Sequence, residues 1–316
     1  MQALHPRVVD AVWAAVEGLL PLPVDDHPLG CHRPRIHDRI CFEGIVYRLV
    51  LGCSWTTAAR LLKTSATTLR RRRDEWIAAG VFDALCDQAL AGYDRVKGLD
   101  LSEVSIDGSL HKAPCGGEGT GRNPTDRGKL GWKWSLATDR DGIPIGWAID
   151  GANRNDIKLF EPTLNAIEGR GLLTEIETLH LDRGYDAAGV RELCATSGIT
   201  DAVIAKKRKR GEGKNVTERT TEDKDNDDKD EQRTANAPSK GNARSKGNGD
   251  KQSLGLGLRW AVERSNSWFS NFGQLRRNTD RRTIHRMAQI ALAVTLILTV
   301  KLFKWADRWS PAATPT

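Results

Sequence analysis

The chain has 316 residues and a formal net charge of +7, and 39% of its residues are hydrophobic and 28% charged. These values exclude a chain too small or too polar to bury a core, and they fit one large domain with a smaller one. The excess of lysine and arginine favours a polyanionic partner, because each cation that docks on a phosphate releases condensed counterions.

Three further features set expectations about location and cofactors. The six cysteines form no Cys-x-x-Cys pair, so we predict reduced thiols in a cytoplasmic protein rather than a zinc ribbon. The N-terminus has no charged stretch followed by an apolar one, and we expect no signal peptide. An apolar run over 287–303 is shorter than the ~20 residues that a membrane span needs. We therefore predict a buried helix there and no membrane partner.

The N-terminal part, residues 1–98, is predicted to be a helical domain. Apolar residues recur at helical spacing over 8–20, and this first run stops at Pro21. A loop rich in proline, aspartate and histidine follows. Apolar residues then recur at helical spacing over 36–50, which predicts a second helix that ends near Gly52.

Two shorter helices are predicted next. Ser54 or Thr56 can cap a helix that ends at Leu62, and Ser65 can cap a helix over 66–79. Two short helices joined by a tight turn suggest a helix-turn-helix, whose second helix enters the major groove of DNA. We predict phosphate contacts from four consecutive arginines on that helix, although they cannot all face one groove. These residues are Arg70, Arg71, Arg72 and Arg73. The alternative is an ordinary helical bundle with a basic surface.

From about residue 99 the pattern changes to short strands that alternate with helices, and it continues to residue 205. Asp141-Gly142 is a turn signal between two apolar stretches, which predicts a β-hairpin. Such an order is typical of an α/β domain. The predicted strands are 104–106, 132–138, 143–149, 178–181 and 201–205, and the predicted helical stretches are 157–167, 172–173 and 187–197.

Residues 206–253 differ in composition from the rest of the chain. They contain no aromatic residue, and Val216 is their only aliphatic residue beyond alanine. Such a segment cannot bury enough apolar surface to offset its ordering entropy, so we predict a disordered charged insert. We expect order to return at Leu254, with helices over 254–305 and a flexible tail over 306–316.

Two of the predicted strands end in an aspartate with a glycine close behind: Asp107 before Gly108, and Asp182 before Gly184. Strand ends of an α/β sheet are where catalytic groups are placed, and the glycine lets backbone or substrate approach. A third acid, Glu263, lies on a predicted helix. The alternative for each aspartate is an ordinary turn residue.

Three carboxylates at one point would repel one another without a cation. Mg²⁺ prefers oxygen ligands, and two ions about 4 Å apart can activate an attacking hydroxyl and stabilise a leaving oxygen. The pattern therefore favours phosphodiester chemistry at Asp107, Asp182 and Glu263. Asp186 is the rival ligand, although its spacing from Asp182 predicts that it caps the next helix.

The motifs that contain these acids resemble those of the IS5 family, a branch of the IS4-like group of DDE transposases from bacterial insertion sequences. The resemblance covers nearly all of the chain except the insert, and it includes the N-terminal arginines. The second and third motifs are specific. The matched segments are 106–109 for the first motif, 182–186 for the second, and 259–264 with 268–269 and 275–277 for the third.

The resemblance implies an RNase H-like catalytic domain, divided between 99–205 and 254–305, behind the helix-turn-helix region. It implies that Asp107, Asp182 and Glu263 are catalytic and hold two Mg²⁺ ions, with Mn²⁺ as a substitute. The implied reaction is cleavage at the ends of an insertion sequence and strand transfer into target DNA. The implied partners are the terminal repeats and target DNA, bound by a homodimer at the nucleoid.

A wider signature of the group places Tyr, Arg, Glu and Lys around the third acid. Arg259 matches the arginine, four residues before Glu263. Leu256 and Ser270 stand at the tyrosine and lysine positions, so we expect no corresponding contacts from them. Arg259 and Arg264 are predicted to hold phosphate, because a guanidinium fork matches it. The alternative for both is a salt bridge with a neighbouring acid.

Further residues after Asp107 are candidates to line the path of a DNA strand. They are His111, Lys112, Arg122, Lys129 and Lys133, and the alternative for each is a solvated cation. Two rival functions differ from that of a transposase. A DNA-binding regulator would need the helix-turn-helix region but not the three acids, and a nuclease of similar fold would cleave DNA without joining it.

Overall fold

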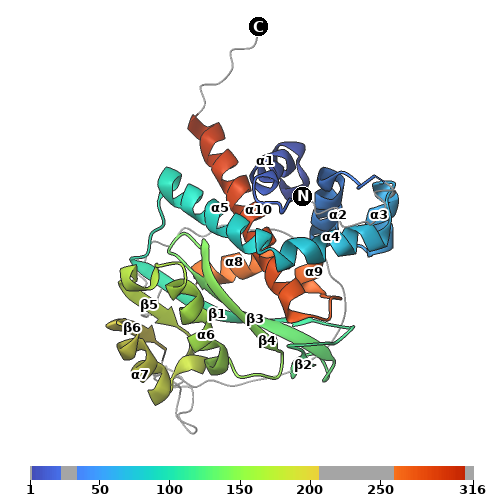
Figure 1. The fold of residues 1–316 in the computed structure, drawn as a ribbon. Helices are drawn as coiled ribbons and strands as arrows, with labels where there is room; N and C mark the ends of the chain where they lie inside the picture. Colours follow the sequence, from blue (N-terminus) through green and yellow to red (C-terminus); the bar gives the residue numbers. More distant parts are fainter. Residues whose placement is uncertain (1, 23–33, 206–259, 310–316) are drawn as a thin grey trace, which may run out of the picture. The chain divides into compact units, whose positions relative to one another are not determined.

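The structure, a computed structural model, describes residues 2–22, 34–205 and 260–309. These residues belong to one compact unit of the chain, drawn in colour in Figure 1. The predicted disorder of 206–253 and the predicted helix start at Leu254 lie outside the described residues. So does the tail from residue 310.

The N-terminal part is helical, as predicted, and its helices begin where the sequence supplies caps. Ser54 Oγ accepts a hydrogen bond from the N–H of Thr57, and Ser65 Oγ accepts one from the N–H of Thr68. Gly52 ends the preceding helix at φ +66°, a left-handed conformation that favours glycine. The helices are η1 (Gln2–Leu4), α1 (Pro6–Glu17), α2 (Asp38–Leu51), α3 (Trp55–Leu61), α4 (Ala66–Ala78) and α5 (Val81–Lys97).

The short helices α3 and α4 are joined by a tight turn over 62–65, in which Lys63 has a φ of 51°. They pack against each other and against α2. The helix α5 was not among the predicted elements. It begins directly after Gly80, which has a φ of 69° and separates it from α4 without a loop. The sequence therefore predicts the stop of α4 and misses the restart behind it.

The strands of the described residues form one sheet, in which β1 has β3 on one side and β5 on the other. β1, β3 and β4 form an antiparallel meander, whereas β5 and β6 run parallel to β1. A meander extended by two parallel strands beyond its first strand is the sheet of an RNase H-like fold. The strands are β1 (Glu103–Lys112), β2 (Gly121–Arg122), β3 (Leu130–Thr138), β4 (Pro144–Gly151), β5 (Thr178–Leu181) and β6 (Asp201–Ile204).

Helices cover both faces of this sheet. Two neighbouring residues of β3 show this, since neighbours on a strand point to opposite faces. On one face, Ser135 Oγ accepts a hydrogen bond from Thr163 Oγ1 of α6 at 2.8 Å. On the other face, Trp134 Nε1 donates to Asn266 Oδ1 of α8 at 2.8 Å. The helices of this part are α6 (Ile157–Glu168), η2 (Leu173–Glu175), η3 (Arg183–Tyr185), α7 (Ala188–Thr196), α8 (Trp260–Ser270) and α9 (Gly273–Arg276).

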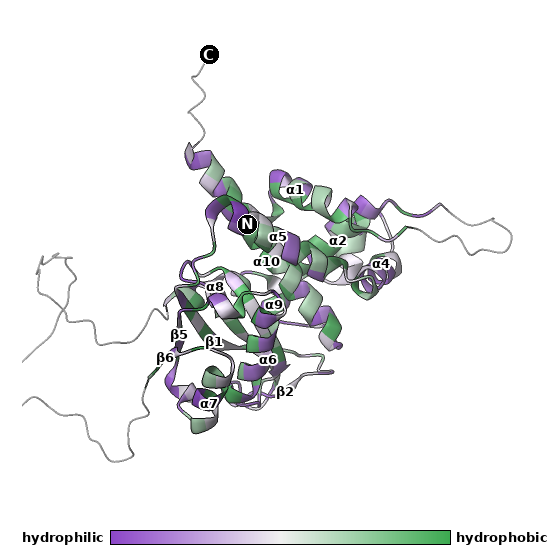
Figure 2. Cartoon of the chain, turned by 60° about the vertical axis from the view of Figure 1, so that its left-hand side comes forward, coloured by the Kyte–Doolittle hydropathy of each residue, from purple (hydrophilic) through white to green (hydrophobic). Residues whose placement is uncertain are grey.

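The last helix, α10 (Thr283–Trp309), has 27 residues and is long and apolar enough to cross a membrane by length and composition alone. Its side chains over 288–298 are almost all buried, and the helix packs against α5, α1 and α4. Figure 2 shows hydrophobic stretches both on these helices and on the strands. A helix buried by other helices is a core helix, as predicted. It continues to Trp309, past the predicted start of the tail.

The first strand differs from the prediction in a way that matters for the site. β1 does not end at Asp107 but continues to Lys112, paired with β3 from Ser105 onward. The polar residues after Asp107 obscure the strand in the sequence, whereas pairing with β3 satisfies their backbone groups. The parallel partner β5 does stop, at Leu181 opposite Ile106. Asp107 therefore lies where β1 leaves its parallel neighbour.

Candidate active site

Asp107 and Asp182 lie side by side because of strand register. Ile106 is paired with Leu181 across the parallel strands β1 and β5, and each aspartate directly follows one of these two residues in the chain. Neighbouring strands lie about 4.8 Å apart. Asp107 Oδ1 accepts from the N–H of Gly108 at 2.9 Å, and Asp182 Oδ1 accepts from the N–H of Gly184 at 2.7 Å. The structure thus brings together two of the three predicted acids.

A buried tyrosine lies next to these carboxylates. Tyr185 packs against Phe160 with ring centroids 5.7 Å apart and is 1% exposed. Burial is the main cause that raises the pKa of its hydroxyl, and the negative charges of Asp156, Asp107 and Asp182 raise it further. Three carboxylates therefore raise the pKa of one hydroxyl. One of them, Asp156, is not among the predicted site residues.

The third predicted acid, Glu263, lies on the first described turn of α8 and is exposed. α8 packs against β1 and β3. It is docked on the turn between β3 and β4, where Ser265 Oγ donates to the carbonyl of Gly142. A Cβ on Gly142 would lie 2.9 Å from the carbonyl oxygen of Ala261, so only glycine allows this approach. The acid is thus carried by a helix that lies against the strand of Asp107.

The carboxylates fit a divalent cation by their chemistry, since hard cations prefer oxygen donors. Asp107 and Asp182 supply such donors at neighbouring positions. Within the described ranges, however, no three His, Cys, Asp or Glu side chains lie close enough together to hold an ion. The structure therefore pairs the two aspartates but does not close Glu263 onto them. The complete triad remains a prediction.

Asp156 lies just before α6, and its carboxylate contacts Lys133 of β3, with Oδ1 2.7 Å from Nζ. Lys133 is buried, with 5% of its surface exposed. The predicted contact of Lys133 with DNA is therefore wrong, because its ammonium is enclosed and paired with a carboxylate. The sequence offers no signal for Asp156 beyond its place before a helix, where an aspartate ordinarily indicates a cap.

The four arginines of α4 divide into two groups. Arg70 and Arg71 are exposed, whereas Arg72 and Arg73 are buried. Arg72 Nε lies 2.8 Å from Asp38 Oδ1, and Arg73 is paired with two acids. The predicted phosphate contacts are therefore wrong for Arg72 and Arg73. A helix turns by about 100° per residue, so four consecutive residues cannot all share one face.

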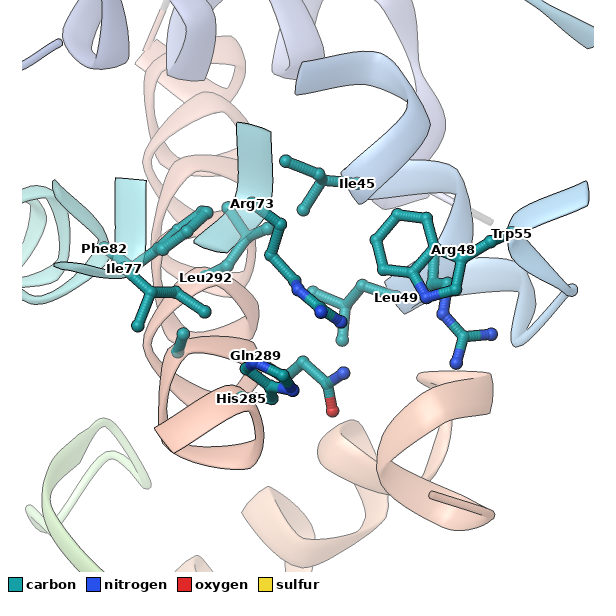
Figure 3. Close-up of a pocket in the computed structure, with 11 residues that line it drawn as sticks. Ile45, Arg48, Leu49, Trp55, Arg73, Ile77, Phe82, His285, Gln289 and Leu292 are labelled. Atoms are coloured by element: carbon teal, nitrogen blue, oxygen red, sulfur yellow. The ribbon is translucent and has the colours of Figure 1, made fainter. Parts of the chain in front are cut away.

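Arg73 belongs to a buried group between α2, α4 and α10 that we call the Asp280 cluster: Arg48, Arg73, Asp280 and Gln289. Arg73 Nη1 lies 3.0 Å from Asp280 Oδ1, and Arg48 Nη2 lies 3.6 Å from Asp280 Oδ2. Gln289 Nε2 donates to Asp280 Oδ2 at 2.6 Å. Figure 3 shows Arg48, Arg73 and Gln289 around a small cavity whose lining contains none of the three predicted acids.

Other predicted residues are also placed. His111 is buried, its ring stacks on that of Trp134 at 3.5 Å, and burial lowers its pKa to about 3, so it is neutral and does not bind phosphate.

Arg264 donates to the carbonyl of Asp141 and lies over two tryptophan rings, so its guanidinium holds α8 against the turn between β3 and β4. Lys129 is exposed, as its predicted role requires. Arg259 lies outside the described residues.

Asp186 does not cap the next helix, contrary to the prediction. Its Oδ1 accepts from Arg191 Nη2 at 2.5 Å, one turn into α7. Asp182, rather than Asp186, performs the capping function at this turn, since its carboxylate receives the N–H of Gly184 at the start of η3. Asp186 is therefore tied to α7 through Arg191, and Ala187 stands at the N-cap of that helix.

The chain matches two protein families over most of its length. Residues 8–86 match the family described as "Putative transposase of IS4/5 family", and residues 98–299 match the family described as "Transposase DDE domain". A Burkholderia cepacia protein, "Putative transposase for insertion sequence element IS402", is 32% identical over 184 residues, which are 56% of this chain and 67% of that relative. A second protein of that organism, "Insertion element IS402 uncharacterized 16.2 kDa protein", is 31% identical over 120 residues, 38% of this chain and 82% of the relative.

Solved structures of Mos1 transposase are more distant. A paired-end complex with the left transposon end is 13% identical, with a TM-score of 0.22 over 58% of this chain and 62% of that one. A pre-cleavage transpososome is 12% identical, with a TM-score of 0.24 over 58% of this chain and 63% of that one. The chain thus covers less than two thirds of these proteins.

The sheet order, the paired aspartates and the family match define an RNase H-like catalytic domain of the DDE class behind a helical region. The class breaks and transfers phosphodiester bonds with divalent metals. The chain belongs to the transposase DDE domain family and is a transposase of the IS4/5 family, with the IS402 transposase among its relatives.

Proposed function

We propose that this transposase cleaves DNA at the ends of its insertion sequence and transfers the freed strand into target DNA. The observation that carries the proposal is the register of β1 and β5, which sets Asp107 beside Asp182. The helix α8, with Glu263 on its exposed side, lies against the same strand. A regulator that only binds DNA has no use for this arrangement of acids.

Asp107, Asp182 and Glu263 would hold two Mg²⁺ ions, or Mn²⁺ in their place. When bound, such ions activate the attacking oxygen and stabilise the leaving oxygen of an in-line displacement. The chain itself fixes the carboxylates. The N–H groups of Gly108 and Gly184 each hold one oxygen of an aspartate, and the turn at Gly142 fixes the helix that carries Glu263. Preorganisation of this kind removes the cost of ordering the acids during the reaction.

An exposed basic surface beside β1 supports DNA as the partner. The N–H of Asn278 donates to the carbonyl of Lys112 at 2.8 Å, and the N–H of Glu118 donates to that of Arg281 at 2.8 Å. The segment 276–282 therefore lies against the end of β1 and the loop that follows it. The exposed cations of these segments and of the hairpin at β2 are Lys112, Arg122, Arg127, Lys129, Arg276, Arg277, Arg281 and Arg282.

The charges of this surface are largely unmatched. Lys112 Nζ lies 3.9 Å from Asp126 Oδ2, and the other seven cations form no ion pair with any residue that the structure describes. Such a surface attracts a phosphate backbone, because binding releases counterions. Arg70 and Arg71 on α4 are a second candidate for phosphate contact, in the helical region.

The test uses a labelled duplex that carries the terminal repeats flanking the gene of this protein. The duplex is incubated with Mg²⁺ and either the wild type or Glu263→Gln. We expect cleavage by the wild type and none by the variant. Binding without cleavage by both proteins would instead support a DNA-binding remnant. A second duplex, supplied as target, separates a transposase from a nuclease, because only a transposase joins the freed 3′ end to it.

The proposal includes a homodimer that holds two ends, located with the nucleoid in the cytoplasm. Light scattering of the complex with end DNA gives the number of protein chains per complex. A mass that corresponds to two chains and two duplexes is expected. A complex of one chain and one duplex that still cleaves and joins would remove the dimer from the proposal.

A further inference from the structure

The carboxylate of Asp156 does not perform the usual task of an acid before a helix. An aspartate at a helix start ordinarily accepts a hydrogen bond from the first turn. In the described chain, however, Asn155 Oδ1 accepts the hydrogen bond from the N–H of Ile157, and Asp156 makes no capping hydrogen bond. Its Oδ1 instead accepts from Lys133 Nζ at 2.7 Å. The side chain is therefore directed at the sheet.

The Asp156 carboxylate occupies the space that a side chain at position 108 would fill. A Cβ on Gly108 would lie 2.4 Å from Asp156 Oδ1, far inside van der Waals contact. Gly108 pairs with Ser135 and Leu110 with Lys133, so Gly108 and Lys133 are diagonal neighbours on one face of the sheet. The Asp156 carboxylate thus lies against the backbone of the residue that directly follows Asp107.

The exposure of the pair also points to the site. The side chain of Lys133 is 6% exposed, whereas that of Asp156 is 40% exposed. An ion pair of this kind is a weak source of stability, since a buried ammonium loses its hydration and an apolar residue could fill the same space. The pair nevertheless fixes a partly open negative charge at Gly108 on the α6 face of the sheet, across the backbone of β1 from the side chain of Asp107. The negative charges of Asp156, Asp107 and Asp182 all raise the pKa of the Tyr185 hydroxyl.

We propose that Asp156, held by Lys133 against Gly108, is a positioning residue of the active site whose fixed negative charge strengthens the binding of divalent cations by Asp107 and Asp182. The inference rests on the proposed function of those two acids. A carboxylate near a bound cation favours it by Coulomb attraction without being a ligand. Removal of such a supporting group typically weakens metal affinity by about 10- to 100-fold.

The test measures Mn²⁺ binding by calorimetry on the full-length protein without DNA, for the wild type, Asp156→Asn and Asp156→Glu. The asparagine keeps the shape of the side chain and can still accept from Lys133. We expect Asp156→Asn to bind Mn²⁺ about 10-fold more weakly, and Asp156→Glu to recover most of the affinity. Affinity equal to that of the wild type in Asp156→Asn overturns the inference.

Asp87→Asn is the matched control. Asp87 Oδ1 lies 3.0 Å from Arg170 Nε, just beyond the far end of α6, and the two side chains are 56% and 17% exposed. The twelve residues of α6 span about 18 Å, so the control removes the same charge at a distance. We expect wild-type Mn²⁺ affinity. An equal loss of affinity in both variants would mean that net charge alone is responsible, and would overturn the inference.

A second readout separates positioning from a purely structural role. Cleavage rates at increasing Mg²⁺ should show that Asp156→Asn needs about 10-fold more Mg²⁺ for half its maximal rate, while the rate at saturating Mg²⁺ stays within about 3-fold of that of the wild type. A lower rate at every Mg²⁺ concentration with an unchanged midpoint indicates a structural role and overturns the inference.

Gly108→Ala keeps every charge while displacing the Asp156 carboxylate, and it provides an independent check should Asp156→Asn fold poorly. We expect weaker Mn²⁺ binding in Gly108→Ala, and unchanged affinity counts against the inference. Asp182→Asn is the reference for the proposed function. If Asp182→Asn loses Mn²⁺ binding and Asp156→Asn does not, only the inference fails. If Asp182→Asn binds Mn²⁺ like the wild type, the proposed metal site fails as well.

Discussion

Two groups of charged residues lie inside this protein, and they are balanced differently. In the Asp280 cluster two buried arginines share one buried aspartate, and a glutamine donates to the oxygen that faces Arg48. Beside β1 the arrangement differs, since one buried lysine, Lys133, is paired with Asp156, while Asp107 lies next to Asp182 where β5 ends. The first group joins elements that are far apart in sequence. The second lies where β5 ends, and its carboxylates offer the oxygen donors that a divalent cation prefers.

The same contrast occurs on the single helix α4. Its inner side carries Arg72 and Arg73, which are paired with acids of the core, and its outer side carries Arg70 and Arg71 in solvent. Identical residue types therefore have different tasks within one turn. Burial and the nearest carboxylate decide the task, and composition does not.

The largest effect is expected from the site acids. Asp107→Asn, Asp182→Asn and Glu263→Gln should each lower the rate of end cleavage by at least about 10³-fold, because each removes a charge needed only in the reaction. The free energy of unfolding should change by less than about 1 kcal/mol. Single-turnover cleavage and urea unfolding measure the two quantities. A normal rate in Glu263→Gln would show that another acid completes the site.

The Asp280 cluster should behave in the opposite way. Asp280→Asn removes the buried carboxylate shared by Arg48 and Arg73 and leaves Arg73 only its contact with Asp74, and we expect the free energy of unfolding to fall by about 3–5 kcal/mol. Urea unfolding measures the change. The control is Asp307→Asn, which breaks an exposed pair with Arg7 and should cost less than about 1 kcal/mol. A similar small cost for Asp280→Asn would contradict a structural role of the cluster.

Another buried acid, Asp139, is held by backbone N–H groups rather than by a cation. Its oxygens accept from Ile143 at 2.6 Å and from Asp100 at 3.3 Å. Burial, the main cause, raises its pKa to about 6 from the ordinary 3.8. A raised folded pKa stabilises the fold below the unfolded pKa, and this stabilisation is lost as the pH rises through the folded pKa.

The free energy of unfolding of the wild type should therefore lose roughly 2 kcal/mol from this group between pH 4 and pH 7. Asp139→Asn should not show this loss, so the difference between the two proteins measures the contribution of Asp139. Urea unfolding at several pH values provides both curves. Parallel curves for the two proteins would show that Asp139 is not the responsible group.

The smallest effect is expected from the outer side of α4. Arg70→Ala and Arg71→Ala should each reduce the slope of log affinity against log salt for end DNA by about 1, with little change in stability. Arg72→Met should instead lower stability, because Asp38 loses its buried partner. Fluorescence anisotropy at several salt concentrations measures the slopes. An unchanged slope for both outer arginines would transfer DNA binding to the surface at 276–282.

The sequence by itself determined the types of most elements, although not α5, and the positions of Asp107 and Asp182 as candidate acids. Helix caps at Ser54 and Ser65 and the turn at Asp141-Gly142 are local signals, because each depends on hydrogen bonds or dihedral angles within a few residues. The place of Asp182 at the end of β5 follows from the same local pattern. The family motifs added the third acid, which no periodicity indicates.

Only the tertiary structure decided which charged residues share an environment. β1 continues past Asp107 because β3 pairs with it, and a pairing partner 19 or more residues away leaves no local signal. Lys133 is enclosed by α6 and joined to Asp156, while Arg72 and Arg73 find acids 34 and 207 residues away. Charge pairing depends on distance and burial, which arise from the folded chain. The sequence therefore shows which side chains are charged, and the fold decides which of them form ion pairs.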